Sequence, residues 1–231
     1  MSTRRGEVDP AVLPVRLPPL YAIVDAELAA RHGRPPPDLA AACFDGGARL
    51  VQLRAPGVAS GQLEEWCDAI VARAERYEAM VIVNDRADVA RACGAAGVHV
   101  GQGDLPPAAT RAILKPAAIV GLSTHNATQV AEARSQPVNY LAVGPVYPTG
   151  TKATGYAPVG LALVHAAAAR QPARPVVAIG GITLDRAPEV IASGAAAVAV
   201  ISDLFRGDSP EQRVRAYVDQ LGDCAPASDF P

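Results

Sequence analysis

Short apolar runs alternate with longer amphipathic stretches along most of this chain. The apolar runs are rich in Val, Ile, Leu and Ala, and most are closed by Gly, Asn, Asp or Ser, which is typical of strands buried in a parallel sheet. There are eight of them: LYAIVD (20–25), ARLVQLR (48–54), MVIVND (80–85), GVHVGQ (97–102), AIVGLS (118–123), YLAVGP (140–145), PVVAIG (175–180) and AAVAVIS (196–202).

The stretches between the runs predict helices. Residues 60–77 repeat their apolar side chains at helical spacing, and residues 209–221 do the same behind Ser209, an expected N-cap. Eight alternations of strand and helix in 231 residues predict one α/β domain, a single (β/α)8 TIM barrel. An open doubly wound sheet is the alternative, but no G-x-G-x-x-G follows the first run.

The ends of the chain differ in composition from the middle. Residues 1–18 and 222–231 are rich in Pro, Ser and charge, so we expect a flexible N-terminal extension, a barrel over residues 19–221 and a flexible C-terminal tail. The first residues lack the apolar run of a signal peptide. No stretch approaches the ~20 apolar residues of a membrane span, so we expect no membrane partner.

Charge and cysteine content exclude further classes. The formal net charge is -2 without a basic stripe, which gives no support for nucleic-acid binding. The four cysteines have no C-x-x-C spacing and are expected to be free thiols, as suits a reducing cytoplasm. The sequence leaves the oligomeric state open, a homo-oligomer included.

Polar residues gather where the predicted strands end. In a β/α barrel the active site is built at the carboxyl ends of the strands, so these residues are expected to line a ligand-binding mouth. In chain order they are Asp25; Gln52 and Arg54; Asn84 and Asp85; Gln102 and Asp104; Ser123, Thr124 and His125; Tyr147, Thr149, Thr151 and Lys152; Gly180 and Gly181; and Ile201 and Ser202.

Asp85 and Asp104 follow two successive predicted strands. Two carboxylates at adjacent strand ends suit Mg²⁺, which completes its coordination with water and phosphate oxygens. Each residue has an alternative interpretation as a helix N-cap, Asp85 before RADVARAC and Asp104 before a helix opening at Pro106 or Pro107.

Two further groups of residues have the composition of phosphate-binding sites. The loop GPVYPTGTK at 144–152, together with Arg54, combines hydroxyls and cations that can hold a diphosphate, although a plain Pro/Gly-rich surface loop is the alternative. AIGGIT and AVISDLF place small residues where strands turn into helices, and such loops hold a monophosphate in many barrels. The glycine pair could equally serve only a tight turn.

Two histidines are given no catalytic role. His99 lies within a predicted strand and is expected to be a barrel residue. His125 lies at a strand end and could equally cap a helix.

Six blocks in order resemble the signature of the thiamine-phosphate synthase family: QLR (52–54), VND (83–85), HVGQGD (99–104), GLSTH (121–125), GPVYPTGTK (144–152) and AIGGI (178–182). The resemblance covers roughly residues 19–221. It implies that hydroxymethylpyrimidine diphosphate loses pyrophosphate while the ring nitrogen of hydroxyethylthiazole phosphate bonds to the exposed methylene, in a dissociative, Mg²⁺-dependent transfer. Such a reaction depends on positioning and charge neutralisation rather than acid–base chemistry.

The resemblance also implies roles for individual residues. Asp85 and Asp104 would hold Mg²⁺, and the catalytic residues would be Arg54, Ser123 and Lys152. The diphosphate would contact Arg54, Asn84 and Lys152, with Ser123 beside it and Gln52 facing the pyrimidine. The thiazole phosphate would contact the hydroxyls of Thr149 and Thr151 and the amides of Gly181, Ile201 and Ser202.

Pro56 departs from the family pattern. The family has a diphosphate-binding lysine two residues after the arginine of QLR, whereas this chain reads QLRAPG. Two other hypotheses stay open. One is a thiazole tautomerase-like relative on the same fold, and the other is a non-catalytic barrel that binds thiazole or thiamine phosphate, which Pro56 alone favours. Pro145 argues against the tautomerase, in which a histidine replaces that proline. The retained Asp85, Asp104 and Lys152 argue against a binding protein.

Overall fold

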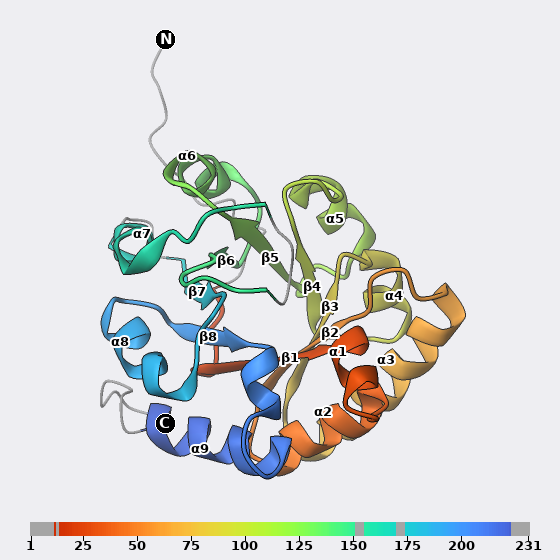
Figure 1. Ribbon diagram of the computed structural model, residues 1–231. Helices are drawn as coiled ribbons and strands as arrows, with labels where there is room; N and C mark the ends of the chain where they lie inside the picture. Colours follow the sequence, from red (N-terminus) through yellow and green to blue (C-terminus); the bar gives the residue numbers. More distant parts are fainter. Residues whose placement is uncertain (1–11, 13, 151–154, 170–173, 223–231) are drawn as a thin grey trace.

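The computed structural model describes residue 12 and residues 14–150, 155–169 and 174–222. Eight parallel strands follow one another in chain order and close into a barrel, because β8 pairs back onto β1 (Figure 1). The predicted TIM barrel is therefore confirmed. The strands are β1 Leu20–Asp25, β2 Leu50–Arg54, β3 Met80–Asn84, β4 Gly97–Val100, β5 Ile119–Thr124, β6 Tyr140–Val143, β7 Val176–Ile179 and β8 Ala197–Val200.

Helices surround the strands as an outer layer (Figure 1). They are α1 Ala26–Arg31, α2 Pro36–Asp45, α3 Ser60–Ala74, α4 Ala87–Ala92, α5 Pro107–Ile113, α6 Ala127–Glu132, α7 Gly160–Ala168, α8 Ala187–Ala192 and α9 Pro210–Gly222, with 3-10 turns η1 Glu75–Tyr77, η2 Ala133–Ser135, η3 Leu184–Arg186 and η4 Ser202–Phe205. The expected N-cap of the last helix is confirmed, since Gln212 N donates to Ser209 Oγ at 3.2 Å.

The strands bury both of their faces, which explains their continuous apolar sequence. On β1, Leu20, Ala22 and Val24 join the large cluster beneath the helices, whereas Tyr21 and Ile23 join a smaller cluster inside the barrel. Successive side chains of a strand point to opposite faces, so every second residue faces the barrel interior.

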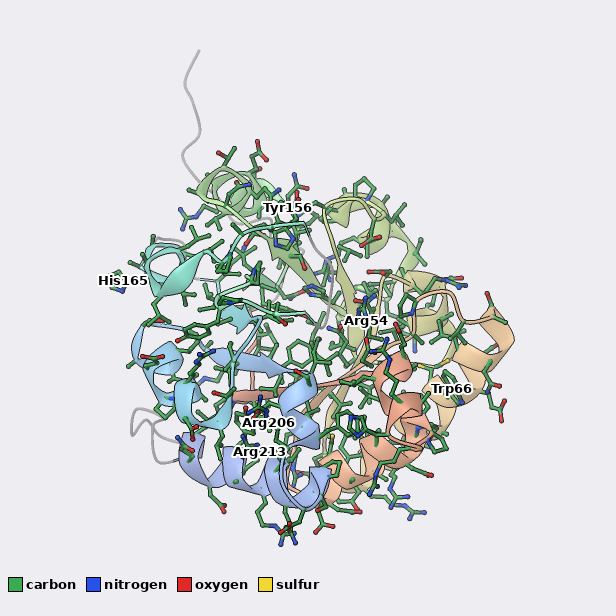
Figure 2. All side chains as sticks on the ribbon, viewed as in Figure 1. Arg54, Trp66, Tyr156, His165, Arg206 and Arg213 are labelled. Carbon is green, nitrogen blue, oxygen red and sulfur yellow. The ribbon has the colours of Figure 1, made fainter. Side chains whose placement is uncertain are left out.

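This alternation brings polar residues into the interior. Gln52 and Arg54 lie two residues apart on β2. His99 and Ser123 lie two residues after a glycine, on β4 and β5. All four polar side chains line one interior cavity. Figure 2 shows Arg54 near the centre of the ring and Trp66 of α3 in the outer layer. The barrel thus carries its chemistry inside, at the end where the strands finish.

The predicted division into an extension, a barrel and a tail stays a prediction. Residues 1–11, 13 and 223–231 lie outside the described residues. Before β1, Val15 and Leu17 are half-buried against the interior cluster. Within the described ranges, no helix has the length and apolar character needed to cross a bilayer.

Candidate active site

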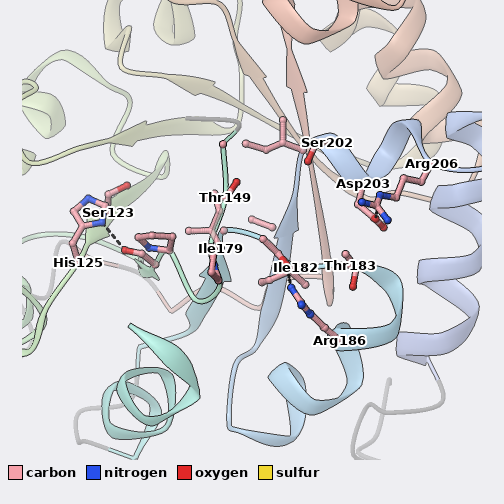
Figure 3. Close-up of a pocket in the computed structure, with 18 residues that line it drawn as sticks. Ser123, His125, Thr149, Ile179, Ile182, Thr183, Arg186, Ser202, Asp203 and Arg206 are labelled. Carbon is pink, nitrogen blue, oxygen red and sulfur yellow. Dashed lines mark hydrogen bonds and ion pairs between the residues drawn. The ribbon is translucent and has the colours of Figure 1, made fainter. Parts of the chain in front are cut away.

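An open cavity of about 300 Å³ lies at the carboxyl ends of β5 to β8. Five of the predicted substrate-binding residues line it: Ser123, Thr149, Gly181, Ile201 and Ser202. Figure 3 shows Ser123 and His125 on one side of the cavity and Ser202 with Arg206 on the other. A volume of this size is within the range of small-ligand sites. We call this space the outer cavity.

The loop after β6 forms one wall of the outer cavity. Val146 N donates to Ile179 O at 2.8 Å and Tyr147 N donates to Gly180 O at 3.0 Å, so this loop continues beside the end of β7. Thr149 lies on the described part of the loop. Thr151 and Lys152, which were expected to contact the two phosphates, lie outside the described residues.

Gly181 allows the loops after β6 and β7 to touch. Its φ is +65°, and a Cβ there would lie 2.6 Å from Pro148 O and 2.8 Å from the Cβ of Tyr147. A larger residue would therefore be strained twice, by its backbone conformation and by this contact. The glycine does more than permit a turn, because it shapes the wall of the outer cavity.

Two arginines that were not predicted also line the outer cavity, Arg186 and Arg206. Arg186 donates to Gly181 O at 2.9 Å, and its guanidinium lies 4.4 Å from the centre of the Tyr147 ring. Positive charge beside backbone amides suits an anion. The sequence prediction stopped just before both residues, since Arg186 lies three residues after AIGGIT and Arg206 directly follows AVISDLF.

Asp203 supports the wall that contains Ser202. Its buried carboxylate accepts from Arg213 Nε at 2.9 Å and from the Tyr217 hydroxyl at 2.6 Å. Burial, with the bond to Asp203, raises the pKa of Tyr217, so its hydroxyl keeps its proton. These bonds tie the turn η4 to helix α9 and fix the position of the Ser202 amide.

A second, smaller cavity lies within the barrel and adjoins the first. Gln52, Arg54, Asn84 and Ser123, all predicted to bind the pyrimidine diphosphate, line it. We call it the inner cavity. The two cavities share four residues: Ser123, Ile179, Ala199 and Ile201. A ligand in one would therefore lie next to a ligand in the other.

Arg54 reaches the inner cavity as one half of an ion pair. Its Nη1 donates to the Asp25 carboxylate at the end of β1, and both side chains are largely buried. Its Nε is buried without a hydrogen-bond partner among the described residues. An unsatisfied buried donor is costly, and an anionic ligand oxygen would satisfy it. Asp25 was noted at a strand end, but its sequence context did not reveal this role.

Pro56 lies in the exposed turn that follows Arg54. Val58 N donates to Ala55 O at 3.4 Å, and Gly57 has a φ of +75°. Proline and glycine at the two central positions are typical of a type II turn. The position at which the family resemblance implies a lysine is thus occupied by a turn residue without charge.

A chain of hydrogen bonds crosses the barrel interior, and four of its five residues line the inner cavity. Gln52 Nε2 lies 2.8 Å from the Tyr21 hydroxyl, which is 3.1 Å from the Tyr140 hydroxyl. His99 then bridges Tyr140 and Ser123 through its two ring nitrogens, at 3.0 Å and 2.9 Å. His99 is a barrel residue, as expected, but it also touches a predicted site residue.

Asp85 and Asp104 lie at the ends of neighbouring strands. Asp85 has a φ of 63°, and its N donates to His99 O at 2.8 Å, which places it beside β4. The N-cap of α4 is Arg86 and that of α5 is Pro106, so neither aspartate is the helix N-cap of the alternative interpretation. Asp104 instead closes a turn by accepting from Gly101 N at 2.7 Å.

Asp85 and Asp104 are the type of residue that magnesium prefers as a ligand. Both side chains offer oxygen, and Asp85 adopts a conformation that is unusual for a residue with a side chain, which is common at functional sites. Among the described residues, no group of three or more His, Cys, Asp or Glu forms a metal site. If both carboxylates bind one ion, its other ligands would come from water and phosphate, as they do for Mg²⁺.

The comparisons with known proteins agree with one another. The model of the family described as thiamine monophosphate synthase matches residues 20–204. The thiamine-phosphate synthase of Chlorobium luteolum is 39% identical over 183 residues, covering 79% of this chain and 86% of that protein. The thiamine-phosphate synthase of Mycolicibacterium smegmatis is 43% identical, and the match covers 75% of this chain and 80% of that protein. A thiamine phosphate pyrophosphorylase from Pyrococcus furiosus superimposes with a TM-score of 0.81 at 28% identity, covering 90% of this chain and 98% of that one.

Proteins of lower sequence identity share the barrel fold with this chain. The 2-keto-3-deoxy-6-phosphogluconate aldolase of Zymomonas mobilis superimposes with a TM-score of 0.61 at 18% identity and shares only the fold. The family match runs from β1 into η4 and contains all six signature blocks, together with every residue that lines the two cavities except Arg206. This chain belongs to the thiamine monophosphate synthase family.

Proposed function

We propose that this chain joins hydroxymethylpyrimidine diphosphate to hydroxyethylthiazole phosphate, giving thiamine phosphate and pyrophosphate. The main structural support for this function is the pair of adjoining cavities that share Ser123 and Ile201. A reaction between two ring substrates needs two compartments that meet at one point. The curated relatives that match this chain at about 40% identity are named for this synthesis.

Each cavity suits one substrate. The inner cavity would take the pyrimidine, with Gln52 on the ring and Ser123 beside it, and would direct the diphosphate towards Arg54, Asn84 and Lys152. The outer cavity would take the thiazole phosphate. Its contacts would be the hydroxyls of Thr149 and Thr151 and the amides of Gly181, Ile201 and Ser202, with Arg186 and Arg206 adding positive charge.

The chemistry then needs little proton transfer. The bond between the methylene carbon and the diphosphate oxygen breaks, the electron pair leaves with pyrophosphate, and the thiazole nitrogen forms the new bond to carbon. Arg54, held by Asp25, stabilises charge on the leaving oxygens. Mg²⁺ bound at Asp85 and Asp104 would supply further positive charge to the same group. The two cavities hold the reacting atoms together, which removes much of the entropic barrier.

Pro56 affects the same charge balance. One cation that the family directs at the diphosphate is absent, and the exposed turn offers none in its place. We propose that Arg54, Lys152 and the metal suffice for turnover. The free Cys43 and Cys67 are compatible with the reducing cytoplasm, where we propose that the protein acts.

A coupling assay tests this function. Purified protein is incubated with both substrates and Mg²⁺, and thiamine phosphate is measured against a chelated control. Magnesium-dependent product is the expected result. Binding of either phosphate without product would favour a non-catalytic barrel. Isomerisation of a thiazole phosphate without coupling would favour the tautomerase-like alternative.

A further inference from the structure

We propose that His99 is a positioning residue for Ser123, and that the buried hydrogen-bond chain starting at Gln52 determines where the Ser123 hydroxyl points. The inference rests on the proposed function for its kinetic consequences. Its structural part concerns the direction of the hydrogen bonds and can be tested without turnover. Gln52 and Ser123 both line the inner cavity, and the chain joins them through Tyr21, Tyr140 and His99.

The hydrogen bonds between Gln52 and His99 all run in one donor-to-acceptor direction. Gln52 places its amide nitrogen towards Tyr21, and an amide N–H can only donate, so the Tyr21 oxygen accepts at 2.8 Å. The one proton of Tyr21 is then given to Tyr140 at 3.1 Å, and the proton of Tyr140 to His99 Nδ1 at 3.0 Å. A phenol oxygen can accept two hydrogen bonds, so the bond from Gln52 does not alone fix the others; with Gln52 donating, however, only this direction gives the protons of both Tyr21 and Tyr140 an acceptor within the chain.

The last hydrogen bond, between His99 and Ser123, determines which way the serine proton can point. With Nδ1 accepting, neutral His99 has its proton on Nε2, which donates to Ser123 Oγ at 2.9 Å. The Ser123 hydroxyl accepts that bond, so its own proton remains to be donated elsewhere. The inner cavity, which Ser123 lines, is where an anionic diphosphate oxygen would take it.

The interior keeps this chain intact. Tyr21 and Tyr140 are fully buried, and burial raises the pKa of both hydroxyls, so neither loses its proton near neutral pH. Gly121 makes room for Tyr140, because a Cβ there would lie 2.1 Å from its Cζ. Tyr21 and Tyr140 also contact edge to face, with ring centres 6.1 Å apart. Buried networks of this kind strengthen when every member has its partner.

The reverse polarity is the competing arrangement. If Tyr21 donated to the Gln52 carbonyl, then Tyr140 would donate to Tyr21, His99 Nδ1 would donate to Tyr140, and Ser123 would donate to Nε2. The serine proton would then be turned away from the ligand. The tautomer of His99 distinguishes the two directions.

Nitrogen NMR of ¹⁵N-histidine-labelled protein reads that tautomer directly. The His99 signals are identified by their loss in His99→Gln. A protonated Nε2 with a bare Nδ1, and a shift of those signals in Tyr140→Phe, are expected. A protonated Nδ1 would overturn the proposal, whether or not the protein turns out to be a synthase.

A kinetic cycle tests the action through Ser123. Tyr140→Phe and His99→Gln should lower kcat by up to about 100-fold, the effect of misplacing a reacting group, with the KM for thiazole phosphate unchanged. Neither change should lower kcat further in a Ser123→Ala background, because coupled residues are non-additive. Tyr77→Phe, which removes an outer-layer hydroxyl bonded to Asp45, is the matched control.

The outcomes are distinct. A wild-type protein without product refutes the proposed function and leaves the tautomer result to decide the hydrogen-bond direction. An active wild type with unchanged kcat in Tyr140→Phe, at equal folded content by circular dichroism, refutes the positioning role. Full additivity with Ser123→Ala refutes it as well.

Discussion

Asp25 holds the guanidinium of Arg54 at the point where β1 and β2 end side by side. The two residues are register partners in the parallel sheet, and the pair is largely buried. The other carboxylate oxygen of Asp25 accepts from Leu28 N at 2.9 Å and caps α1. One side chain thus joins a strand, a helix start and a cation of the inner cavity.

Replacing Asp25 by Asn separates these roles. The amide oxygen can still cap α1, but Arg54 loses its counter-charge. Removing one partner of a buried ion pair lowers the free energy of unfolding by about 3–5 kcal/mol. We expect such a loss in urea unfolding of Asp25→Asn, together with lower turnover. Glu27→Gln removes the exposed partner of Arg31 and should change stability by less than about 1 kcal/mol. Equal effects of the two changes would contradict the role of Asp25.

Asp85→Asn tests the metal pair without disturbing the backbone. Asparagine tolerates the left-handed conformation at φ 63°, whereas alanine would add strain. Turnover should fall by about 100-fold or more, and the remaining activity should need more Mg²⁺. The measurement is a magnesium titration of the coupling reaction. Asp88→Asn, which alters an exposed pair with Arg86, is the control, and activity in Asp85→Asn that matches wild type would refute the metal assignment.

Gly181→Ala should raise the KM for thiazole phosphate with little change in that for the pyrimidine diphosphate. The new methyl group would press on Pro148 O and displace the wall of the outer cavity. Gly33→Ala is the matched control, because Gly33 has nearly the same φ, +66°, but has no atom within 4 Å of the added Cβ. Steady-state kinetics with each substrate varied in turn distinguish the two. Identical effects would mean that backbone strain, not the contact, is responsible.

Pro56→Lys restores the cation of the family pattern. The first central position of a type II turn accepts residues other than proline, so the turn should persist. We expect kcat/KM for the pyrimidine diphosphate to rise, with a steeper dependence on salt because an exposed charge is screened. Pro56→Gln is the uncharged control. A gain of the same size in both variants would show that charge is not the cause.

The buried thiols predict a loss of stability at alkaline pH. Burial raises the pKa of Cys43 from 9.0 to about 12 and that of Cys67 to about 11. Well below pH 9 the thiols are neutral in both the folded and the unfolded state. Above it the unfolded chain ionises first, so stability falls by about 1.4 kcal/mol per pH unit for each thiol. Cys43→Ala should show a shallower decline between pH 9 and 11 and the same slope as wild type below pH 8, measured by chemical unfolding.

The barrel could be predicted from the sequence because its strands are buried on both faces. LYAIVD has the same boundaries as β1. Each other predicted run overlaps one strand, and only β5 extends past its run, by one residue, to Thr124. The helix expected over 60–77 ends as a 3-10 turn from Glu75, because Glu78 turns left-handed at φ 51°. Three of the four cysteines are free thiols, as expected, and Cys224 lies outside the described residues.

The site could be predicted where polar residues lie at the end of a predicted strand or just after it. Arg54, Ser123 and Ser202 were found in this way, and they line the cavities. Tyr21 and Tyr140 were not found, because a tyrosine in an apolar strand has the same pattern as a core residue. Arg186 and Arg206 were missed because they lie on the turns beyond the signature blocks. Their contribution depends on how those turns fold back over the mouth.

Closure of the sheet has a consequence for how copies of this chain can meet. Since β8 pairs with β1, each strand already has a neighbour on both sides, so the barrel offers no row of free backbone amides and carbonyls to an added strand. Strand addition, a common route to aggregation, is blocked while the barrel is folded. Any homo-oligomer must therefore form through the helices and loops, where surface side chains determine the affinity.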